Sequence, residues 1–258
     1  MLPAQRRDML LSRLRDDGHV VVKDLAREFG IAQDSLRRDL RDLAAAGLCQ
    51  RVYGGALPVS PAIADYAARQ DVSPESKRHV AARAAALIPP GSTVILDGGT
   101  TTLQVARALP PDLEATVVTH SPTVAATLIA HPRVELYLIG GRVFKHSAVT
   151  SGAAAVEAAQ TVNADLFLLG VTGVHPHAGL TTGDGDEAAM KRTLAHRAAD
   201  TYVLGSAEKI GTASRFGVLP LAEIAGLVTD ADPAHPTLRE LERAGVPIIF
   251  AAGEPDYG

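Results

Sequence analysis

The sequence predicts two unequal domains, a small and mainly helical one followed by a larger α/β one. Three observations support this. The chain has 258 residues, which exceeds one average domain. Residues 1–57 carry ten Lys or Arg against eight Asp or Glu, a net charge of +2, whereas the remainder has a net charge of −6. Beyond residue 92, short apolar runs alternate with helical patterns at intervals of roughly twenty to thirty residues, as in successive βαβ units.

The composition limits the class of protein. Apolar residues make up 47% of the chain, which is ample for a buried core, and there is no Trp. The single cysteine, Cys49, allows no disulfide within the chain and favours a reducing compartment. No apolar stretch approaches the ~20 residues that cross a bilayer, so we expect a cytoplasmic protein with no membrane partner. A basic segment joined to an acidic body suggests two tasks, one of them facing a polyanion.

The first elements form a compact helical pattern. A helix is predicted over 4–16 after Pro3, with Arg6 on its outer side, then a short β-like run over 19–22, and a second helix over 23–29 that Gly30 closes. A third helix is predicted over 33–46. Two short helices joined by a tight turn that contains glycine are typical of a helix-turn-helix.

The third helix has two different faces. Leu36, Leu40 and Leu43 fall on one stripe at helical spacing. The opposite side carries guanidinium and amide groups, which suit base edges and phosphate oxygens, from Gln33, Arg37, Arg38 and Arg41. The alternative is a solvated charged face with Asp39 and Asp42 as partners, and this helix alone does not decide between them.

The segment 48–56 reads as a short strand that runs into a glycine turn, in other words a wing. Arg51 at its tip would meet the phosphate backbone. The DNA-contacting residues predicted from the third helix and the wing are Gln33, Asp34, Ser35, Arg37, Arg38, Arg41, Arg51 and Tyr53.

The segment 58–73 reads as a linker or a loosely packed connecting helix. Ser73 as N-cap and Pro74 at the first position then open a helix that runs to about residue 88. The domains are therefore predicted as 1–57, a linker over 58–73, and 74–258.

The larger domain is predicted to be an open, mostly parallel sheet. Most of its strands are continuous apolar runs, as expected when helices cover both faces. The predicted strands are 93–97, 116–119, 134–139, 164–169, 202–205, 226–229 and 247–250, and the predicted helices between them are 101–108, 122–130, 152–162, 186–199 and 236–244.

Ligands of such sheets sit outside the carboxyl ends of the strands, where helices begin. The exits here are rich in Gly and Thr, which offer backbone N–H groups and hydroxyls to an anion. One such exit is ordinary turn chemistry, but several together indicate a phosphorylated or polyhydroxylated ligand. The residues at these exits are Asp97, Gly98, Gly99, Thr100, Thr101 and Thr102, then Thr119 and His120, then Gly140, Gly141 and Arg142, then Gly170, Val171, Thr172 and Gly173, and finally Lys209.

Other sites find little support. Neither a dinucleotide fingerprint nor a Walker loop is present, and there is no G-x-S-x-G elbow. His175, His177, Asp184 and Asp186 match no common metal-site spacing, so we expect an exposed loop there and no metal. No cofactor is predicted.

Several motifs carry a family resemblance. "KDLAREFG", "SLRRDLRDLAAAG" and "RVYGGA" resemble the winged helix-turn-helix of DeoR-type bacterial transcriptional regulators. "LIPPGSTVILDGGTTT", "VVTHS", "LIGGR", "ADLFLLGVTGV" and "GLTTGDGDEAAMKRTL" resemble their sensor domain, over nearly all of residues 75–230. The resemblance implies a fold similar to ribose-5-phosphate isomerase, recognition of a sugar phosphate, and effector contacts from Glu187, Lys191 and Lys209. The chain departs from the family pattern at Ala32, Tyr53, His120 and Ser206, where Ser, His, Asn and Asp are usual.

The resulting hypothesis is a regulator, most simply a repressor of a carbohydrate operon, that a sugar phosphate releases from operator DNA. Two DNA-binding domains related by a two-fold axis require at least a homodimer, and a tetramer is a further option. Glu187 and Lys191 lie one helical turn apart and could serve as base and cation in an isomerase, or form a simple surface pair. We prefer a domain that binds the sugar phosphate without converting it, since a DNA-binding domain has no evident use on an isomerase.

Overall fold

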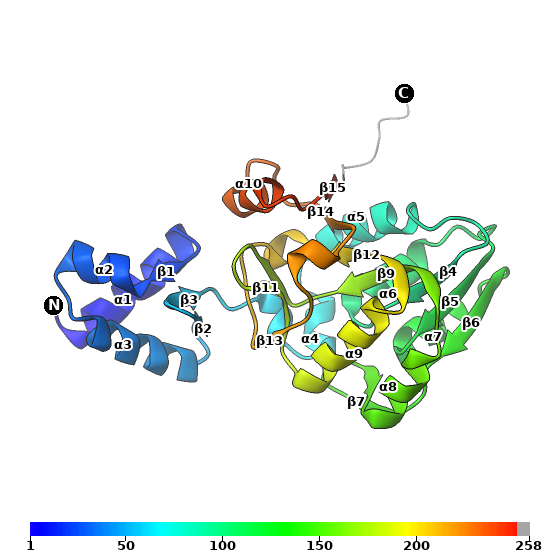
Figure 1. The fold of residues 1–258 in the computed structure, drawn as a ribbon, viewed down its shortest axis with the longest axis horizontal. Helices are drawn as coiled ribbons and strands as arrows, with labels where there is room; N and C mark the ends of the chain where they lie inside the picture. The colour runs from blue at the N-terminus through cyan, green and yellow to red at the C-terminus, as the bar shows by residue number, and fades with distance from the viewer. Residues whose placement is uncertain (252–258) are drawn as a thin grey trace.

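The computed structural model describes residues 1–251 and shows the N-terminal domain as a separate body at one end of the long axis (Figure 1). Its helices are α1 (Pro3–Asp16), α2 (Val22–Phe29) and α3 (Gln33–Ala45). Its strands are β1 (Val20–Val21), β2 (Gln50–Val52) and β3 (Gly55–Leu57), which form an antiparallel sheet in the order β1-β3-β2. The predicted winged helix-turn-helix is confirmed.

The apolar stripe of α3 makes the core of this domain. Leu36, Leu40 and Leu43 pack with Leu10 and Leu14 of α1 and are almost fully buried. Gly30 ends α2 in the left-handed region at φ 63°, which a residue with a Cβ adopts only at a cost. The tight turn between α2 and α3 therefore depends on that glycine.

The larger domain, called the sheet domain below, is built on a seven-stranded parallel sheet. The strands lie in the order β15 (Ile248–Phe250), β14 (Gly226–Thr229), β12 (Ala198–Leu204), β9 (Ala164–Gly170), β4 (Thr93–Leu96), β5 (Ala115–Thr119) and β6 (Val134–Leu138). The order reverses direction at β4 and β9, where successive crossovers run to opposite sides. The carboxyl ends of those two strands are therefore the place where a ligand crevice forms.

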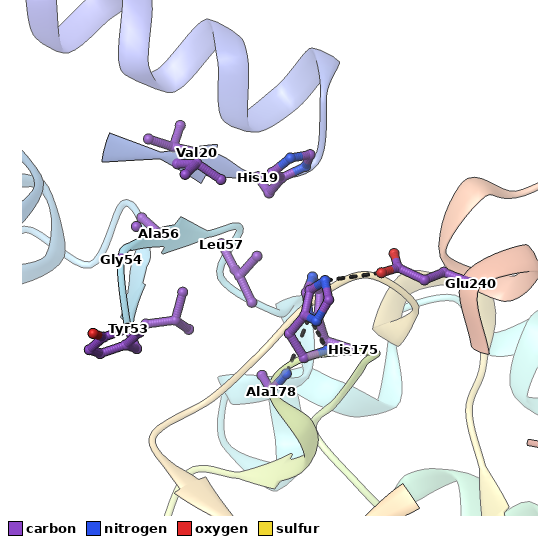
Figure 2. A pocket seen from close by; sticks show the side chains of 13 residues that line it. His19, Val20, Tyr53, Gly54, Ala56, Leu57, His175, Ala178 and Glu240 are labelled. Atoms are coloured by element: carbon purple, nitrogen blue, oxygen red, sulfur yellow. Dashed lines mark hydrogen bonds and ion pairs between the residues drawn. The ribbon is translucent and has the colours of Figure 1, made fainter. Parts of the chain in front are cut away.

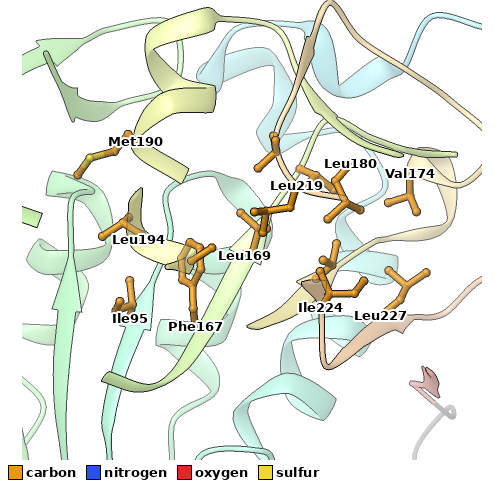
Figure 3. Packing of buried hydrophobic residues seen from close by; sticks show 14 of the residues in the cluster. Ile95, Phe167, Leu169, Val174, Leu180, Met190, Leu194, Leu219, Ile224 and Leu227 are labelled. Carbon is orange, nitrogen blue, oxygen red and sulfur yellow. The ribbon is translucent and has the colours of Figure 1, made fainter. Parts of the chain in front are cut away.

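Helices cover both faces of the sheet and form two separate cores. One face packs against α5 (Pro74–Ala85), α6 (Thr100–Ala108) and α7 (Pro122–Leu128). The other face packs against α8 (Ala153–Gln160), α9 (Gly185–Ala195) and α10 (Pro236–Arg243). Figure 3 shows the second core, in which Phe167 and Leu169 of β9 meet Met190 and Leu194 of α9. The predicted open α/β sheet is confirmed.

Three details of the sequence prediction are wrong. The helix predicted over 186–199 ends at Ala195, and strand β12 begins at Ala198 because that segment pairs with β9. Ser73 does not cap α5, because it adopts φ 44° and its side chain makes no capping bond. Strand β6 is not covered on both faces, since it is the sheet edge and exposes Tyr137 and Leu138.

Two small sheets were not predicted. Strands β7 (Arg142–Phe144) and β8 (Val149–Ser151) form a hairpin, and β10 (Gly173–His175), β11 (Gly179–Thr182) and β13 (Phe216–Gly217) form a three-stranded sheet. The exposed loop expected at residues 175–177 is partly wrong, because His175 is 9% exposed whereas the His177 side chain is 80% exposed. Strands of two to four residues give too little periodicity to be recognised in sequence.

The connecting segment (residues 58–73) is structured. It contains a short 3-10 helix, η1 (Pro61–Ile63), and helix α4 (Tyr66–Gln70), whose first turns are capped by the side chains of Ser60 and Asp65. Ser60 and Ala62 are buried against the larger domain. Of the two readings of this segment, the connecting helix is the one observed. Two further 3-10 helices, η2 (Ala207–Lys209) and η3 (Leu221–Glu223), lie later in the chain.

Candidate functional site

The outer face of α3 is cationic and exposed. Arg37, Arg38 and Arg41 all face solvent. Arg37 donates hydrogen bonds to Asp34 Oδ1 and Gln33 Oε1, each at 3.0 Å, so its guanidinium is held along the first turn of the helix. Within residues 1–251, Arg38 and Arg41 have no carboxylate within 4.0 Å. Both guanidiniums are therefore available to an external anion.

Asp39 is not a counter-charge for this face. It is 4% exposed and forms an ion pair with Arg6 of α1, on the core side of the helix. The expectation that Arg6 points outward is wrong, and the alternative in which Asp39 neutralises the arginine face loses that partner, because the pair joins α1 to α3 across the domain. The face is consequently more cationic than the sequence suggested, which favours the DNA-reading interpretation over a solvated face.

The N-terminus of α3 lacks a side-chain cap. Ala32 occupies the N-cap position with extended backbone, and no side chain accepts a hydrogen bond from the first turn. Asp34 is engaged by Arg37 instead of substituting as cap. As expected from Ala32, the first turn of α3 therefore lacks a side-chain acceptor at its N-cap position.

The wing is a hairpin whose tip is Tyr53 and Gly54. Arg51 lies in β2 opposite Ala56, so the placement of Arg51 at the tip is wrong by two residues, although its side chain is exposed. Tyr53 is fully exposed. A cavity of about 560 Å³ lies between the wing and the larger domain. In Figure 2, Tyr53 and Leu57 of the wing lie on one side of it, with His175 and Ala178 on the other. The wing therefore faces the sheet domain as well as solvent.

The histidines around this cavity do not form a metal site. His177 Nε2 lies 3.0 Å from Glu240, and His175 Nδ1 accepts a hydrogen bond from the His177 backbone N–H at 3.1 Å. Burial lowers the pKa of His175 to about 4, so it is neutral at physiological pH. Within residues 1–251 there is no group of three or more His, Cys, Asp or Glu side chains that could hold a metal ion.

The second candidate site lies where β4 and β9 end. The loop after β4 enters α6 through Gly98 and Gly99, and Thr102 Oγ1 donates to Gly98 O at 3.2 Å. A Cβ on Gly98 would lie 2.0 Å from Val149 Cγ1, so only glycine allows the loop to pass there. This loop lines a small inner cavity together with Gly170, Val171 and Thr172 from the end of β9.

Four basic side chains converge on the inner cavity: Arg69, Lys77, Lys191 and Lys209. The three lysines are nearly fully buried. Only Lys191 is paired with carboxylates, those of Asp97 and Glu187. Within residues 1–251, no carboxylate lies within 4.0 Å of Arg69, Lys77 or Lys209. Lys77 and Lys209 are therefore buried cations without an anionic partner, which is costly, and an anionic ligand would reduce that cost.

The surroundings of these cations lower the pKa values of three of them, Lys209, Lys77 and Arg69. The pKa of Lys209 is lowered to about 8, mainly by burial, with smaller contributions from Lys77 and Arg69 nearby, although Glu208 opposes them. Burial likewise lowers the pKa of Lys77 and of Arg69. Lys209 Nζ donates to Thr101 Oγ1 at 3.0 Å, which ties this cation to the loop.

Asp97 anchors the network from behind the cavity wall. Burial by itself would raise the pKa of Asp97, but the Lys191 ammonium and the hydrogen bond from His120 outweigh it and lower the pKa to about 2. His120 Nε2 lies 2.8 Å from Asp97 Oδ1 and its Nδ1 lies 3.1 Å from Thr150 O. Because Asp97 and His120 are both fully buried, they hold the cavity in shape and do not line it.

A wider outer cavity of about 280 Å³ adjoins the inner one and shares Ala62, Arg69, Thr172 and Glu187 with it. Glu187 Oε2 accepts a hydrogen bond from Ser147 Oγ at 3.0 Å, and its Oε1 lies 3.2 Å from Lys191 Nζ. Each oxygen of the carboxylate thus has one partner and keeps a lone pair for a ligand. Asp184, Arg215 and His146 add polar groups to the outer cavity.

The predicted effector residues divide into three groups. Those that line the inner cavity are Gly98, Gly99, Thr100, Thr101, Thr102, Glu187, Lys191 and Lys209. Asp97, Thr119 and His120 are fully buried and lie outside the lining. Gly140, Gly141 and Arg142 line neither the inner nor the outer cavity, because β6 ends at the far edge of the sheet.

Arg69 and Lys77 were missed, whereas Thr172 belongs to a predicted strand exit. Lys77 had a recognisable signal, because it lies three and four residues before Val80 and Ala81 on the buried stripe of α5. A lysine on an apolar stripe indicates a buried charge with a task. Arg69 had no such signal, since α4 is only five residues long.

Comparison with known proteins bears on the whole chain. Residues 6–62 match the model of the DeoR-like helix-turn-helix domain, and residues 72–231 match that of the DeoR C-terminal sensor domain. The HTH-type transcriptional regulator GlpR of Haloferax volcanii is 33% identical over 251 residues, 96% of this chain and 98% of that protein. The putative aga operon transcriptional repressor of Escherichia coli O157:H7 is 32% identical over 254 residues, 96% of this chain and 93% of that protein.

Among solved structures, ribose 5-phosphate isomerase A from Methanocaldococcus jannaschii matches with a TM-score of 0.38 and 16% identity, over 50% of this chain and 51% of that one. No helix within residues 1–251 has the length and apolar character needed to cross a membrane.

Proposed function

Because the chain belongs to the DeoR family of transcriptional regulators, with both its helix-turn-helix and its sensor domain, we propose that it represses a carbohydrate-metabolism operon and that a phosphorylated sugar releases it from operator DNA. Residues 1–57 read DNA, 58–73 connect, and 74–258 bind the effector and assemble the oligomer. The similar repressor of E. coli O157:H7, whose name refers to the aga operon, supports the carbohydrate assignment.

The observation that carries the effector class is the set of cations at the inner cavity, of which Lys77 and Lys209 are buried and Arg69 is half-buried. Arg69, Lys77 and Lys209 have no carboxylate within 4.0 Å in the described chain, and they face a loop of glycines and threonines. A phosphate group supplies the missing negative charge and accepts hydrogen bonds from the ammonium groups and hydroxyls. The outer cavity offers Glu187, Ser147 and Asp184 to the hydroxyls of a sugar.

The DNA-binding surface is proposed to be α3 with the wing. Arg37, Arg38 and Arg41 lie on one exposed face of α3. The opposite face of this helix packs into the core of the domain, which holds the helix in place to enter the major groove of DNA. Gln33, Asp34 and Ser35 begin the same helix, and Arg51 and Tyr53 extend the surface along the wing. Two such readers are needed for a palindromic operator, so the working form is a homodimer or a tetramer.

The proposal includes the absence of turnover. Among the described residues that line the inner cavity, Glu187 is the only carboxylate that an isomerase could use as its base, and Ser147 and Lys191 hold its two oxygens in place. We take this fixed carboxylate to orient the hydroxyls of the ligand without removing a proton. Incubation with ribose 5-phosphate should yield ribulose 5-phosphate no faster than buffer, and a rate far above buffer would make the protein an enzyme.

The direct test is a mobility-shift assay on the DNA upstream of the protein's own gene, repeated with ribose 5-phosphate, glucose 6-phosphate and glycerol 3-phosphate. One of these should release the DNA, and the same compound should raise the melting temperature of the full chain. Thr101→Val should abolish both responses and leave operator affinity unchanged, because it removes the hydroxyl that Lys209 contacts. Retention of the response in this variant would place the effector elsewhere.

A further inference from the structure

The connecting segment (residues 58–73) lies over the inner cavity as well as joining the two domains. Ser60 Oγ donates to Thr172 O at 2.5 Å, and Val59 forms a bridge with Ala213. Farther along, the Tyr66 backbone N–H donates to His146 O at 2.8 Å and the Tyr66 hydroxyl lies 3.0 Å from Thr123 Oγ1. The segment is thus fastened to the sheet domain at both ends of the cavity.

Three residues of this segment form part of the cavity wall. Ala62, Arg69 and Val72 line the inner cavity, and Ala62 and Arg69 also separate it from the outer one. The inner cavity has only about 20 Å³ of accessible space, enough for about one water molecule. A phosphate group is several times larger, so it can enter only if part of the wall moves. The β-sheet and the helices α5, α6 and α9, which supply most of the wall, pack into the two cores, whereas α4 has no buried residue. We therefore take the connecting segment as the movable part.

Lys77 shows how the segment is held closed. Its ammonium group is buried and donates hydrogen bonds to the backbone carbonyls of Arg69 and Val72, both in the connecting segment. A phosphate oxygen is a better acceptor for an ammonium group than a neutral carbonyl. An anion in the cavity would therefore compete with the segment for Lys77.

The other end of the segment is joined closely to the DNA-binding domain. Strand β3 of the wing ends at Leu57, and only Pro58 and Val59 separate it from the fastened Ser60. Proline restricts the backbone at this junction. A displacement of residues 60–72 is therefore passed to the wing and not absorbed by a flexible linker.

We propose that the connecting segment is the lid of the effector cavity, that the anionic group of the effector displaces it by taking Lys77 from the carbonyls of Arg69 and Val72, and that this displacement repositions the wing on DNA. The inference rests on the proposed function, because it requires an anion in the inner cavity. It adds the moving element and the contact that the ligand breaks.

The absence of Trp from the chain allows a specific probe of this movement. Tyr66→Trp places the only tryptophan on the lid, at a half-buried site. Saturating ribose 5-phosphate, or the sugar phosphate that releases operator DNA, should shift its emission maximum by several nanometres. Tyr137→Trp, on the exposed edge strand β6, is the matched control and should not respond.

A second variant loosens the lid. Ser60→Ala removes the bond to Thr172 O and the cap of η1. Since one net hydrogen bond corresponds to about a fivefold change in an equilibrium constant, this variant should bind the sugar phosphate roughly fivefold more tightly and release operator DNA at a lower concentration of it. Ser92→Ala removes a comparable bond, to Pro89 O, in a remote turn and should leave the affinity unchanged.

The outcomes separate the two proposals. If a sugar phosphate releases the DNA but neither the emission of the Tyr66→Trp variant nor the affinity of the Ser60→Ala variant changes, the lid is wrong and the proposed function stands. If no sugar phosphate in the panel binds the chain or releases the DNA, the anion site fails and the lid fails with it. A response of Tyr137→Trp equal to that of Tyr66→Trp would also overturn the lid, because the change would then not be local.

Discussion

At the scale of single residues, the buried trio of Asp97, Lys191 and His120 shows why the cavity has a fixed shape. Asp97 accepts from both other side chains and from the Gly170 backbone N–H at 2.8 Å, so one carboxylate joins β4, β5, β9 and α9. His120, where the family pattern has Asn, contacts Asp97 and not the cavity. The His at this position therefore alters the contacts that hold the cavity in shape and not the groups that line the cavity.

Asp97 predicts an acid-dependent loss of stability. Its pKa is lowered from 3.8 to about 2, so its contribution is fully present above pH 3.8 and is lost as the pH falls through about 2. A shift of this size corresponds to about 2 kcal/mol. Urea unfolding between pH 5 and 2 should show that the free energy of unfolding of the wild type falls more steeply than that of Asp97→Asn. Equal slopes would contradict the ionised pair. At pH 7 the variant should be less stable by about 3–5 kcal/mol, because Lys191 loses its main partner.

Arg38 gives the residue-scale test of DNA reading. It is exposed and has no carboxylate within 4.0 Å in the described chain, so its removal should not disturb the fold. Arg38→Ala should weaken operator binding by about 1–3 kcal/mol and relax the preference at one base pair. Arg51→Ala should weaken all sequences alike and reduce the salt dependence by about one counterion. Titrations at several salt concentrations measure both. Arg15→Ala on α1 is the control and should have no effect on specificity.

At the scale of elements, the recognition helix begins without a cap, and this predicts a stabilising substitution. Ala32 already has the extended backbone of an N-cap residue, at φ −61° and ψ 132°, and its side chain is exposed. Ala32→Ser should raise the free energy of unfolding by about 1 kcal/mol, because the hydroxyl can accept a bond from the first turn. Thermal unfolding checks this. The same change at exposed Ala45, in the last turn of α3, should not stabilise, and equal gains at both sites would mean that capping is not the cause.

The lid proposal also belongs to this scale, since one short element connects two sites. Helix α4 has five residues and no buried member, so it is held by the contacts of Ser60, Tyr66 and Lys77 and not by a core of its own. Elements with few buried contacts open at low free-energy cost. The connecting segment is therefore suited to respond to a ligand, whereas the sheet is not.

At the scale of the whole molecule, the DNA-binding domain extends from one end of the sheet domain (Figure 1). A single reader would cover only half of a two-fold symmetric operator. We expect a dimer that binds two half-sites whose centres are separated by one helical turn, about 10–10.5 base pairs, or a multiple of it. Insertion of five base pairs between the half-sites should reduce affinity strongly, and insertion of ten should restore part of it. Equal binding to all three DNAs, or a monomeric mass by light scattering, would contradict the dimer.

Much of the fold could be predicted from the sequence because its signals are local. The stripe of Leu36, Leu40 and Leu43 predicted the recognition helix, and apolar runs, most of them continuous, predicted the strands of the parallel sheet. The glycine-threonine loop at residues 98–102 was predicted to bind an anion because the relevant groups lie within the loop itself, and the loop lines the inner cavity. The prediction of Lys191 and Glu187 came from the family resemblance, which also supported Lys209.

The rest was decided by tertiary structure. The sequence by itself determined which segments form helices and strands and which loop suits a phosphate, because these depend on neighbouring residues. Only the fold decided that Asp39 turns inward to Arg6, that His120 lies behind Asp97, and that the segment beginning at Ser60 covers the cavity. Those contacts join residues that are tens of positions apart in the chain, and no periodicity in the sequence records such pairings.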